Sequence, residues 1–219
     1  MRLFVYCIRL IYSLFFCIRY LPLNQAFKIP ILISPSVRIG KLYRSSIIIK
    51  GNISRSMITI GLPGSEGRGN NRTYISIHKG SHLVFNGNAT FLKGTNIVIK
   101  KGNMMVGNHF LCNVDCFFNC TKQIIIGNNV LIGWNVSFNT NNGHSIYCDG
   151  QKKEMESDIY IGNHVWICAN NEIFKGTSIA DGCVVSHHSV LSKSIKTPNC
   201  LIAGNPARIV KEKVTWTAS

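Results

Sequence analysis

A spacing of six residues constrains this sequence more than any other feature. From residue 161 onward, six aliphatic residues fall six apart without interruption: Ile161, Ile167, Ile173, Ile179, Val185 and Leu191. Two earlier runs keep the same spacing: Val106, Cys112 and Phe118, and then Ile126, Ile132 and Phe138. A period of six matches neither the period of about 3.6 of an α-helix nor the period of about 2 of a strand.

A short strand followed by a turn, wound into a coil, accounts for this spacing. Turn-forming residues follow the periodic ones, as in Ile126-Gly127-Asn128 and Ile161-Gly162-Asn163, where a coil would have to bend. The alternative is a β-sandwich, but its strands recur about every 8–12 residues. The sequence therefore predicts an all-β solenoid of hexapeptide repeats whose periodic residues point inward.

The charge of the chain favours an anionic partner. Its 219 residues carry 24 Lys and Arg but nine Asp and Glu, a net charge of +15. Nucleotide phosphates, an acidic polymer or an anionic membrane face would each be attracted. No zinc finger or other nucleic-acid motif is present, so nucleic acid is not an expected partner.

The nine cysteines are expected to be packed thiols rather than disulfides. Cys112, Cys168 and Cys183 stand at repeat positions or next to them, where a small apolar side chain packs well. Their number is odd, and no paired C-x2-C spacing typical of zinc sites occurs. These features indicate a chain kept in a reducing cytoplasm, without a metal.

The N-terminal segment is apolar but interrupted by charge. Residues 3–23 are rich in Leu, Ile, Phe and Tyr, yet Arg9 and Arg19 leave no run near the ~20 residues of a membrane span. No signal-peptide cleavage site follows. We expect a helix that ends before Pro22 and either packs on the first coil or lies on a membrane surface, and both can hold.

The sequence divides the chain into four segments. We expect an N-terminal helix and lead-in over 1–34, early irregular coils over 35–105 with a protruding loop at 61–73, regular coils over 106–196, and a C-terminal cap over 197–219. The loop 139–158 leaves the regular coils after Phe138 and carries His144. Loops inserted into repeat scaffolds commonly line the functional face.

Three stretches together resemble one family, the hexapeptide-repeat acyltransferases. Residues 139–146 (NTNNGHSI) resemble the family's histidine loop, 161–167 (IGNHVWI) resemble the coil after that loop, and 202–208 (IAGNPAR) resemble its cofactor-binding signature. The N-terminal helix and 64–67 (GSEG) are similar to the branch that acetylates capsular, O-antigen or related polysaccharides. The resemblance implies a left-handed parallel β-helix with a C-terminal cap, a homotrimer, and active sites between neighbouring subunits.

The chemistry of acyl transfer fits this loop. An alcohol is a weak nucleophile at neutral pH, and a histidine is a suitable base for it. The resemblance implies that His144 is this base, that the Ala169 amide donates to the thioester oxyanion, and that Trp166 lines the acceptor and pantetheine channel. Asn142 belongs to the substrate-binding loop and stands where several relatives have Asp. The group that orients His144 is therefore left open.

Acetyl-CoA is the acyl donor that the resemblance implies, with no metal. Six residues match the family's cofactor positions: Ser192, Lys193, Ala203, Gly204, Arg208 and Lys211. Cys168 and His187 stand where the family has small residues, so the path of the pantetheine arm is left open.

The resulting hypothesis is an acetyl-CoA-dependent O-acetyltransferase acting on a sugar hydroxyl of a capsule, O-antigen or exopolysaccharide, or on its precursor. It would work in the cytoplasm or at the inner face of the plasma membrane. N-acylation of an amino-sugar nucleotide and a non-catalytic membrane-associated scaffold are alternatives. A zinc carbonic anhydrase is disfavoured because His109, His144 and His164 lack the spacing of a three-histidine site.

Overall fold

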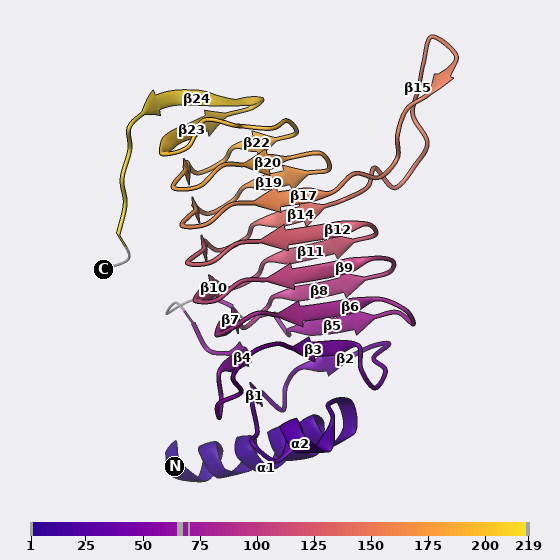
Figure 1. The fold of residues 1–219 in the computed structure, drawn as a ribbon, viewed down its shortest axis with the longest axis vertical. Helices are drawn as coiled ribbons and strands as arrows, with labels where there is room; N and C mark the ends of the chain where they lie inside the picture. Colours follow the sequence, from indigo (N-terminus) through magenta and orange to yellow (C-terminus); the bar gives the residue numbers. More distant parts are fainter. Residues whose placement is uncertain (1, 65–67, 70, 218–219) are drawn as a thin grey trace.

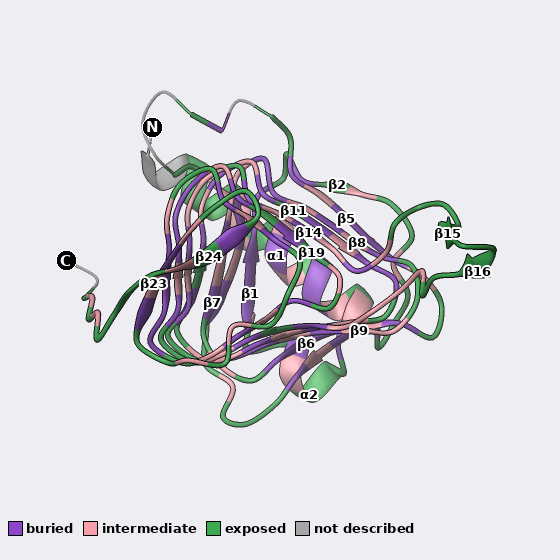
Figure 2. Cartoon of the chain, turned by 90° about the horizontal axis from the view of Figure 1, so that it is seen from above, coloured by how far each residue is buried: buried purple, intermediate pink, exposed green. Residues whose placement is uncertain are grey.

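The computed structural model describes residues 2–64, 68–69 and 71–217 of the chain. Short strands wind into stacked coils that form a three-sided prism, with helix α1 at one end and strand β24 at the other (Figure 1). Viewed along its axis, the prism has a buried interior enclosed by three sheets (Figure 2). The predicted β-solenoid is confirmed.

Each side of the prism is one parallel sheet. Among the described residues, the only antiparallel pair in these three sheets is β23–β24, at the end of the first sheet. The first sheet contains β1 (Ile31–Ile33), β4 (Ile58–Leu62), β7 (Ala89–Leu92), β10 (Phe110–Cys112), β13 (Leu131–Ile132), β18 (Trp166–Ile167), β21 (Val184–Val185), β23 (Cys200–Gly204) and β24 (Ala207–Glu212). The second contains β2 (Arg38–Ile39), β5 (Tyr74–Ile77), β8 (Asn96–Ile99), β11 (Phe117–Cys120), β14 (Ser137–Asn139), β19 (Glu172–Phe174) and β22 (Val190–Leu191). The third contains β3 (Ile47–Ile49), β6 (His82–Phe85), β9 (Asn103–Val106), β12 (Gln123–Ile126), β17 (Ile159–Ile161) and β20 (Ser178–Ile179).

The six-residue spacing places its residues in columns inside the prism. Ile126 pairs with Val106 below and Ile161 above, and Ile167 pairs with Ile132 and Val185 in the same way. All twelve periodic residues are at most 3% exposed. Burial of these aliphatic and aromatic columns is the main stabilising contribution to the coils.

Seven of the nine cysteines are buried, as expected, whereas Cys7 and Cys148 are exposed. Cys112, Cys168 and Cys183 are buried, and all nine cysteines are free thiols.

The turns at two corners of the prism hold residues in the left-handed region. His109, Asn129 and His164 stack at the corner between the third and first sheets, with φ from +53° to +56°. Asn and His adopt this region more readily than most other residues. A ladder of hydrogen bonds runs along the same corner. In each coil a backbone N–H donates to the Asn or Asp side chain of the next coil at 2.7–2.9 Å; the donors are Asn88, Asn108, Asn128 and Asn163.

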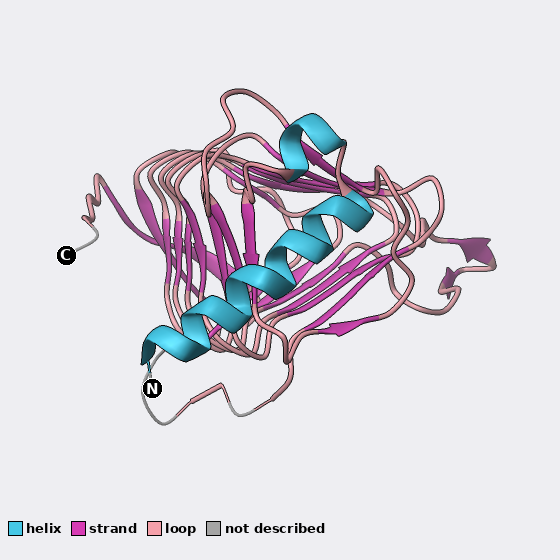
Figure 3. Ribbon diagram, turned by 90° about the horizontal axis from the view of Figure 1, so that it is seen from below, coloured by secondary structure: helices cyan, strands magenta, loops and turns pink. Residues whose placement is uncertain are grey.

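Helix α1 (Arg2–Tyr20) closes the N-terminal end of the prism and is followed by the short α2 (Leu23–Ala26) (Figure 3). The helix ends before Pro22, as expected. Its buried Ser13 lies against the edge of β1, where its Oγ accepts the N–H of Ile33 at 2.9 Å. Phe16 and Cys17 join the core. Neither described helix is long and apolar enough to cross a bilayer.

The sequence predicted a protruding loop over 61–73, but two of its described residues, Arg68 and Asn71, contact the prism. The Arg68 guanidinium lies 4.6 Å from the ring centre of Trp134, and Asn71 Nδ2 donates to Asp115 Oδ1 at 3.0 Å. Residues 65–67 and 70 lie outside the described residues, so most of the 64–67 stretch has no structural account.

Candidate functional site

The loop 139–158 is a two-stranded arm projecting from the corner between the second and third sheets (Figures 1 and 2). Strands β15 (Tyr147–Cys148) and β16 (Gln151–Lys152) pair antiparallel in it. At its root Thr140 is fully buried, and its Oγ1 accepts the N–H of Thr121 at 2.7 Å. The sequence predicted a loop here, and the structure adds that hydrogen bonds fix its direction.

His144 lies at a bend of this arm. Gly143 has φ +77°, and its N–H donates to Asn141 Oδ1 at 2.8 Å. The N–H of Asn142 donates to Met155 O across the arm at 3.1 Å. The imidazole itself is exposed, and within the described residues it has no hydrogen-bond partner. The arm thus presents both ring nitrogens to the exterior, and no orienting carboxylate is present in the same chain's described part.

A hollow of about 460 Å³ lies beside the root of the arm. It is lined by Asn119, Asn139, Asn141, Asn142, Gly143, Ile146 and Phe174. Side-chain amides both donate and accept hydrogen bonds, so this lining suits a polyhydroxylated ligand. Asn119 and Phe174 were not expected in this lining, because both lie outside the 139–158 loop.

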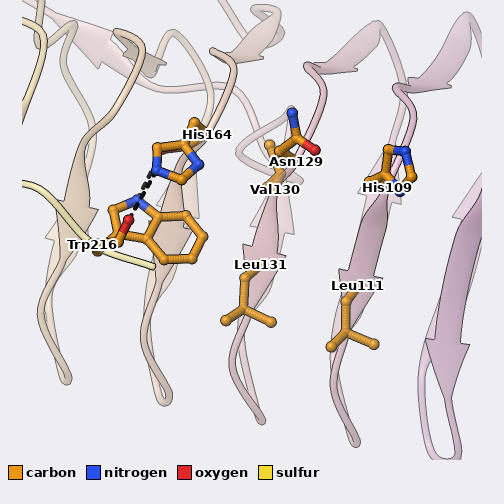
Figure 4. A pocket seen from close by; sticks show the side chains of 7 residues that line it. All are labelled: His109, Leu111, Asn129, Val130, Leu131, His164 and Trp216. Atoms are coloured by element: carbon orange, nitrogen blue, oxygen red, sulfur yellow. Dashed lines mark hydrogen bonds between the residues drawn. The ribbon is translucent and has the colours of Figure 1, made fainter. Parts of the chain in front are cut away.

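Trp166 lies on the first sheet, on another side of the prism from the arm. The C-terminal tail runs back beside the coils and brings Trp216 to 5.9 Å from the Trp166 ring (Figure 1). Trp216 also stacks on His164 at 4.3 Å and 7° (Figure 4). Two hydrogen bonds of 3.0 Å, from Trp216 Nε1 to His164 O and between His164 Nε2 and Trp216 O, fix this arrangement.

A pocket of about 490 Å³ lies next to this aromatic pair. It is lined by His109, Leu111, Asn129, Val130, Leu131, His164 and Trp216 (Figure 4). Sequence reasoning missed Trp216, because it follows the last repeat and no periodic position marks it.

Ala169 lies in the corner between the first and second sheets. Its backbone is buried, and its N–H has no acceptor among the described residues. Gly133 lies against it, where an added Cβ would stand 2.6 Å from the amide nitrogen. A side chain at Gly133 would therefore collide with this buried amide. His187, exposed at the same corner, approaches Trp134 edge-on at 6.5 Å.

The six predicted cofactor residues gather at the C-terminal end. Ser192, Lys193 and Arg208 line one shallow surface hollow. Ala203 pairs with Arg208, Gly204 with Ala207, and Leu201 with Lys211 across β23 and β24. The Lys193, Arg208 and Lys211 side chains are all exposed. Three cations at one end of the prism provide favourable electrostatics for phosphate groups.

A single chain does not assemble the complete predicted site. His144 projects from one corner, Ala169 lies in a second corner, and Trp166 faces outward from the first sheet. Figure 2 shows the arm at the opposite side of the prism from β23 and the C-terminal tail. No group of three or more His, Cys, Asp or Glu side chains in the described ranges could hold a metal ion.

The chain is similar in sequence to known acetyltransferases. The chain is 36% identical over 112 residues to a galactoside O-acetyltransferase of Escherichia coli K12, covering 50% of this chain and 54% of the relative. It is 30% identical over 145 residues to a polysialic acid O-acetyltransferase of Escherichia coli O1:K1, covering 65% of this chain and 44% of the relative. The chain thus spans about half the length of these two relatives. No protein-family model matches it.

A third relative aligns over nearly its whole length. An uncharacterized 24.8 kDa protein in the cps region of Klebsiella pneumoniae is 32% identical over 205 residues, covering 90% of this chain and 86% of that protein. Among solved structures, the polySia specific acetyltransferase NeuO aligns with a TM-score of 0.53 at 23% identity, over 86% of this chain and 73% of that one. This structural likeness confirms the fold, a left-handed β-helix.

Proposed function

We propose a function from one premise: the chain belongs to the hexapeptide-repeat acyltransferases. It transfers an acetyl group from acetyl-CoA to a sugar hydroxyl of a cell-surface polysaccharide or of its precursor. The observation that carries this proposal is the exposed His144 on a hydrogen-bonded arm of an otherwise regular solenoid.

His144 acts as the general base in this proposal. A neutral imidazole nitrogen accepts the proton of the sugar hydroxyl as its oxygen attacks the thioester carbon. The C–S bond then breaks, the acetyl group stays on the sugar oxygen, and the departing thiolate takes up the proton. Both imidazole nitrogens are available in the chain, so one can accept this proton while the other is held by substrate or a neighbouring chain.

The Ala169 amide stabilises the charge that develops on the carbonyl oxygen. Its N–H lacks an acceptor among the described residues, and Gly133 carries no side chain that would collide with it. One aimed donor of this kind contributes about 3 kcal/mol to transition-state stabilisation. Arg208, Lys193 and Lys211 hold the CoA phosphates, while Ser192, Ala203 and Gly204 lie along the cofactor.

The acceptor binds beside the arm, and neighbouring chains complete the site. Asn142 and the amide-lined hollow offer hydrogen bonds to sugar hydroxyls. Similarity to a polysialic acid O-acetyltransferase supports a polymeric acceptor. The arm and Trp166 face different directions in one chain. A homotrimer in which His144 of one subunit lies opposite Trp166 of the next would bring these two parts of the site together. The trimer works in the cytoplasm, in peripheral contact with the inner membrane through residues 3–23.

Release of free thiol from acetyl-CoA, with and without acceptor polysaccharides, tests this function. Release that depends on an acceptor is expected for the wild type, and mass spectrometry should show acetyl groups on sugar oxygens. His144→Ala should lower turnover by roughly 10²–10⁴-fold while CoA binding persists. His78→Ala, away from the candidate site, is the matched control. Full turnover in the His144 variant, or acetylation at nitrogen, would contradict the proposal.

A further inference from the structure

The positive charge is concentrated in the N-terminal part of the chain. Residues 1–65 contain nine Lys and Arg and no Asp or Glu, so they carry +9 of the net +15. The exposed cations among them include Arg19, Lys28, Arg38, Lys41, Arg44, Lys50 and Arg55. The proposed cofactor cations lie at the other end of the prism, so CoA does not account for this basic end.

The outer face of α1 is apolar and exposed in the described part of the chain. Ile8, Ile11 and Phe15 are 44%, 58% and 67% exposed and follow the spacing of one helical face. Just after the helix, Leu23 and Phe27 are 50% and 68% exposed. Figure 3 shows both helices lying across the same end of the prism. Exposed apolar faces of this kind mark contacts with a membrane or a protein.

Apolar side chains and cations occur together at this end. The N–H of Ser45, next to Arg44, donates to Tyr20 O at 3.2 Å, at the end of α1. The N–H of Ser56, next to Arg55, donates to Ile29 O at 2.9 Å. The turns of the first coil that carry these arginines are therefore fixed against the helical segment.

We propose that this basic end, formed by α1, the segment 23–28 and the turns 40–46 and 50–57, docks on an anionic lipid surface. The apolar side chains enter the interface while the cations meet lipid phosphates. A second copy of the chain would bring another +9 to the same contact, and the resulting repulsion disfavours it. The helix lies on the surface rather than crossing it.

Docking by this end would orient the solenoid axis away from the membrane and set the distance between the bilayer and the candidate site. Four strand spacings separate β2 from β14, where the arm begins. At about 4.8 Å each they amount to roughly 19 Å. The helix layer adds about 10 Å. Resting on the proposed function, this geometry selects an acceptor that extends about 30 Å from the bilayer. Such an acceptor is a growing chain rather than the first sugar on its lipid carrier.

Vesicle sedimentation of the full chain tests the docking. We expect binding to vesicles of phosphatidylcholine with phosphatidylglycerol, little binding to phosphatidylcholine alone, and weaker binding at high salt. Lys28→Glu/Lys50→Glu and Ile11→Ser/Phe15→Ser should each lower the bound fraction about tenfold or more. Lys196→Glu, a charge reversal near the other end, should bind like the wild type. All variants should keep acceptor-dependent thiol release with a soluble polysaccharide.

Equal binding of all variants, or of both vesicle types, would overturn the proposal. So would light scattering showing that the Ile11→Ser/Phe15→Ser variant merely dissociates an end-to-end dimer. Because thiol release with a soluble acceptor is measured separately, a failure of docking is distinguishable from a failure of the proposed enzyme activity.

Discussion

Single residues at the corners determine where the coils turn and which side chains remain exposed to solvent. His109, His164 and His188 all take positive φ, which explains their place in the turns without a role in catalysis. His144 differs, because Gly143 supplies the positive φ before it and its own ring projects into solvent. The family resemblance pointed to His144 and to the Ala169 amide, but the sequence could not reveal that this amide lies against Gly133 of the neighbouring coil.

Ser13 is expected to stabilise the N-terminal end through one buried hydrogen bond. Ser13→Ala leaves the Ile33 N–H without its acceptor, which should cost about 1–3 kcal/mol of unfolding free energy. Urea unfolding measures this loss. Ser54→Ala, at an exposed serine, should change stability by no more than about 0.5 kcal/mol. Equal stability of the two variants would show that water replaces Ser13 in this role.

The buried thiols are expected to make the protein sensitive to alkali. Desolvation raises the pKa of the Cys17 thiol to about 11 and that of Cys120 to about 12, from an ordinary value of 9.0. Above pH 9 the unfolded chain loses these protons while the folded chain keeps them. The folded state then binds more protons, so stability should fall as pH rises, by up to about 1.4 kcal/mol per pH unit for each thiol.

Unfolding free energies measured between pH 8 and about 10.5 test this dependence. Cys120→Ala should show a shallower decline than the wild type, whereas Cys7→Ser, at an exposed thiol, should retain the wild-type slope. A free energy that stays constant over this range would contradict the raised pKa values.

At the level of elements, repetition made most of the fold predictable. Each periodic residue faces the interior because coils of similar length stack in register, and that register is visible in the sequence as a spacing. The hairpin in the arm and the return of the tail to His164 were not predictable. Both depend on contacts between segments with no repeated pattern, such as Thr140 with Thr121 and Trp216 with His164.

The side-chain ladder at one corner is expected to hold neighbouring coils together. Asn108 Oδ1 accepts the N–H groups of Asn88 and His109, at 2.8 and 3.0 Å. Asn108→Ala removes both bonds and should lower the unfolding free energy by about 1–2 kcal/mol in urea unfolding. Asn108→Asp keeps the acceptor, as Asp181 does at the top of the ladder, and should stay within about 0.5 kcal/mol of the wild type. Similar losses in both variants would mean that packing, not the bond, matters.

For the whole molecule, the opposed directions of the arm and of Trp166 predict that activity belongs to the assembly. Chains with His144→Ala and chains with Ala169→Trp should each be nearly inactive alone. Co-assembled mixtures should recover part of the activity, because some sites combine an intact His144 arm from one chain with an intact Ala169 corner from another. Light scattering of the wild type should give the mass of a trimer. An active monomer, or mixtures that stay inactive, would contradict a site shared between chains.

The reversal of β24 at the top of the first sheet has a consequence for solubility. Parallel coils can in principle add to one another without limit, and an exposed strand edge is a template for the next molecule. Here β24 runs antiparallel over β23, while Ser13 of α1 occupies the edge of β1 at the other end. These two caps limit the solenoid to one molecule's length. A chain that ends at Gly204 exposes only this one edge, because α1 still covers the other end. It should therefore associate end to end in pairs, which light scattering would detect as a doubled mass relative to the full chain.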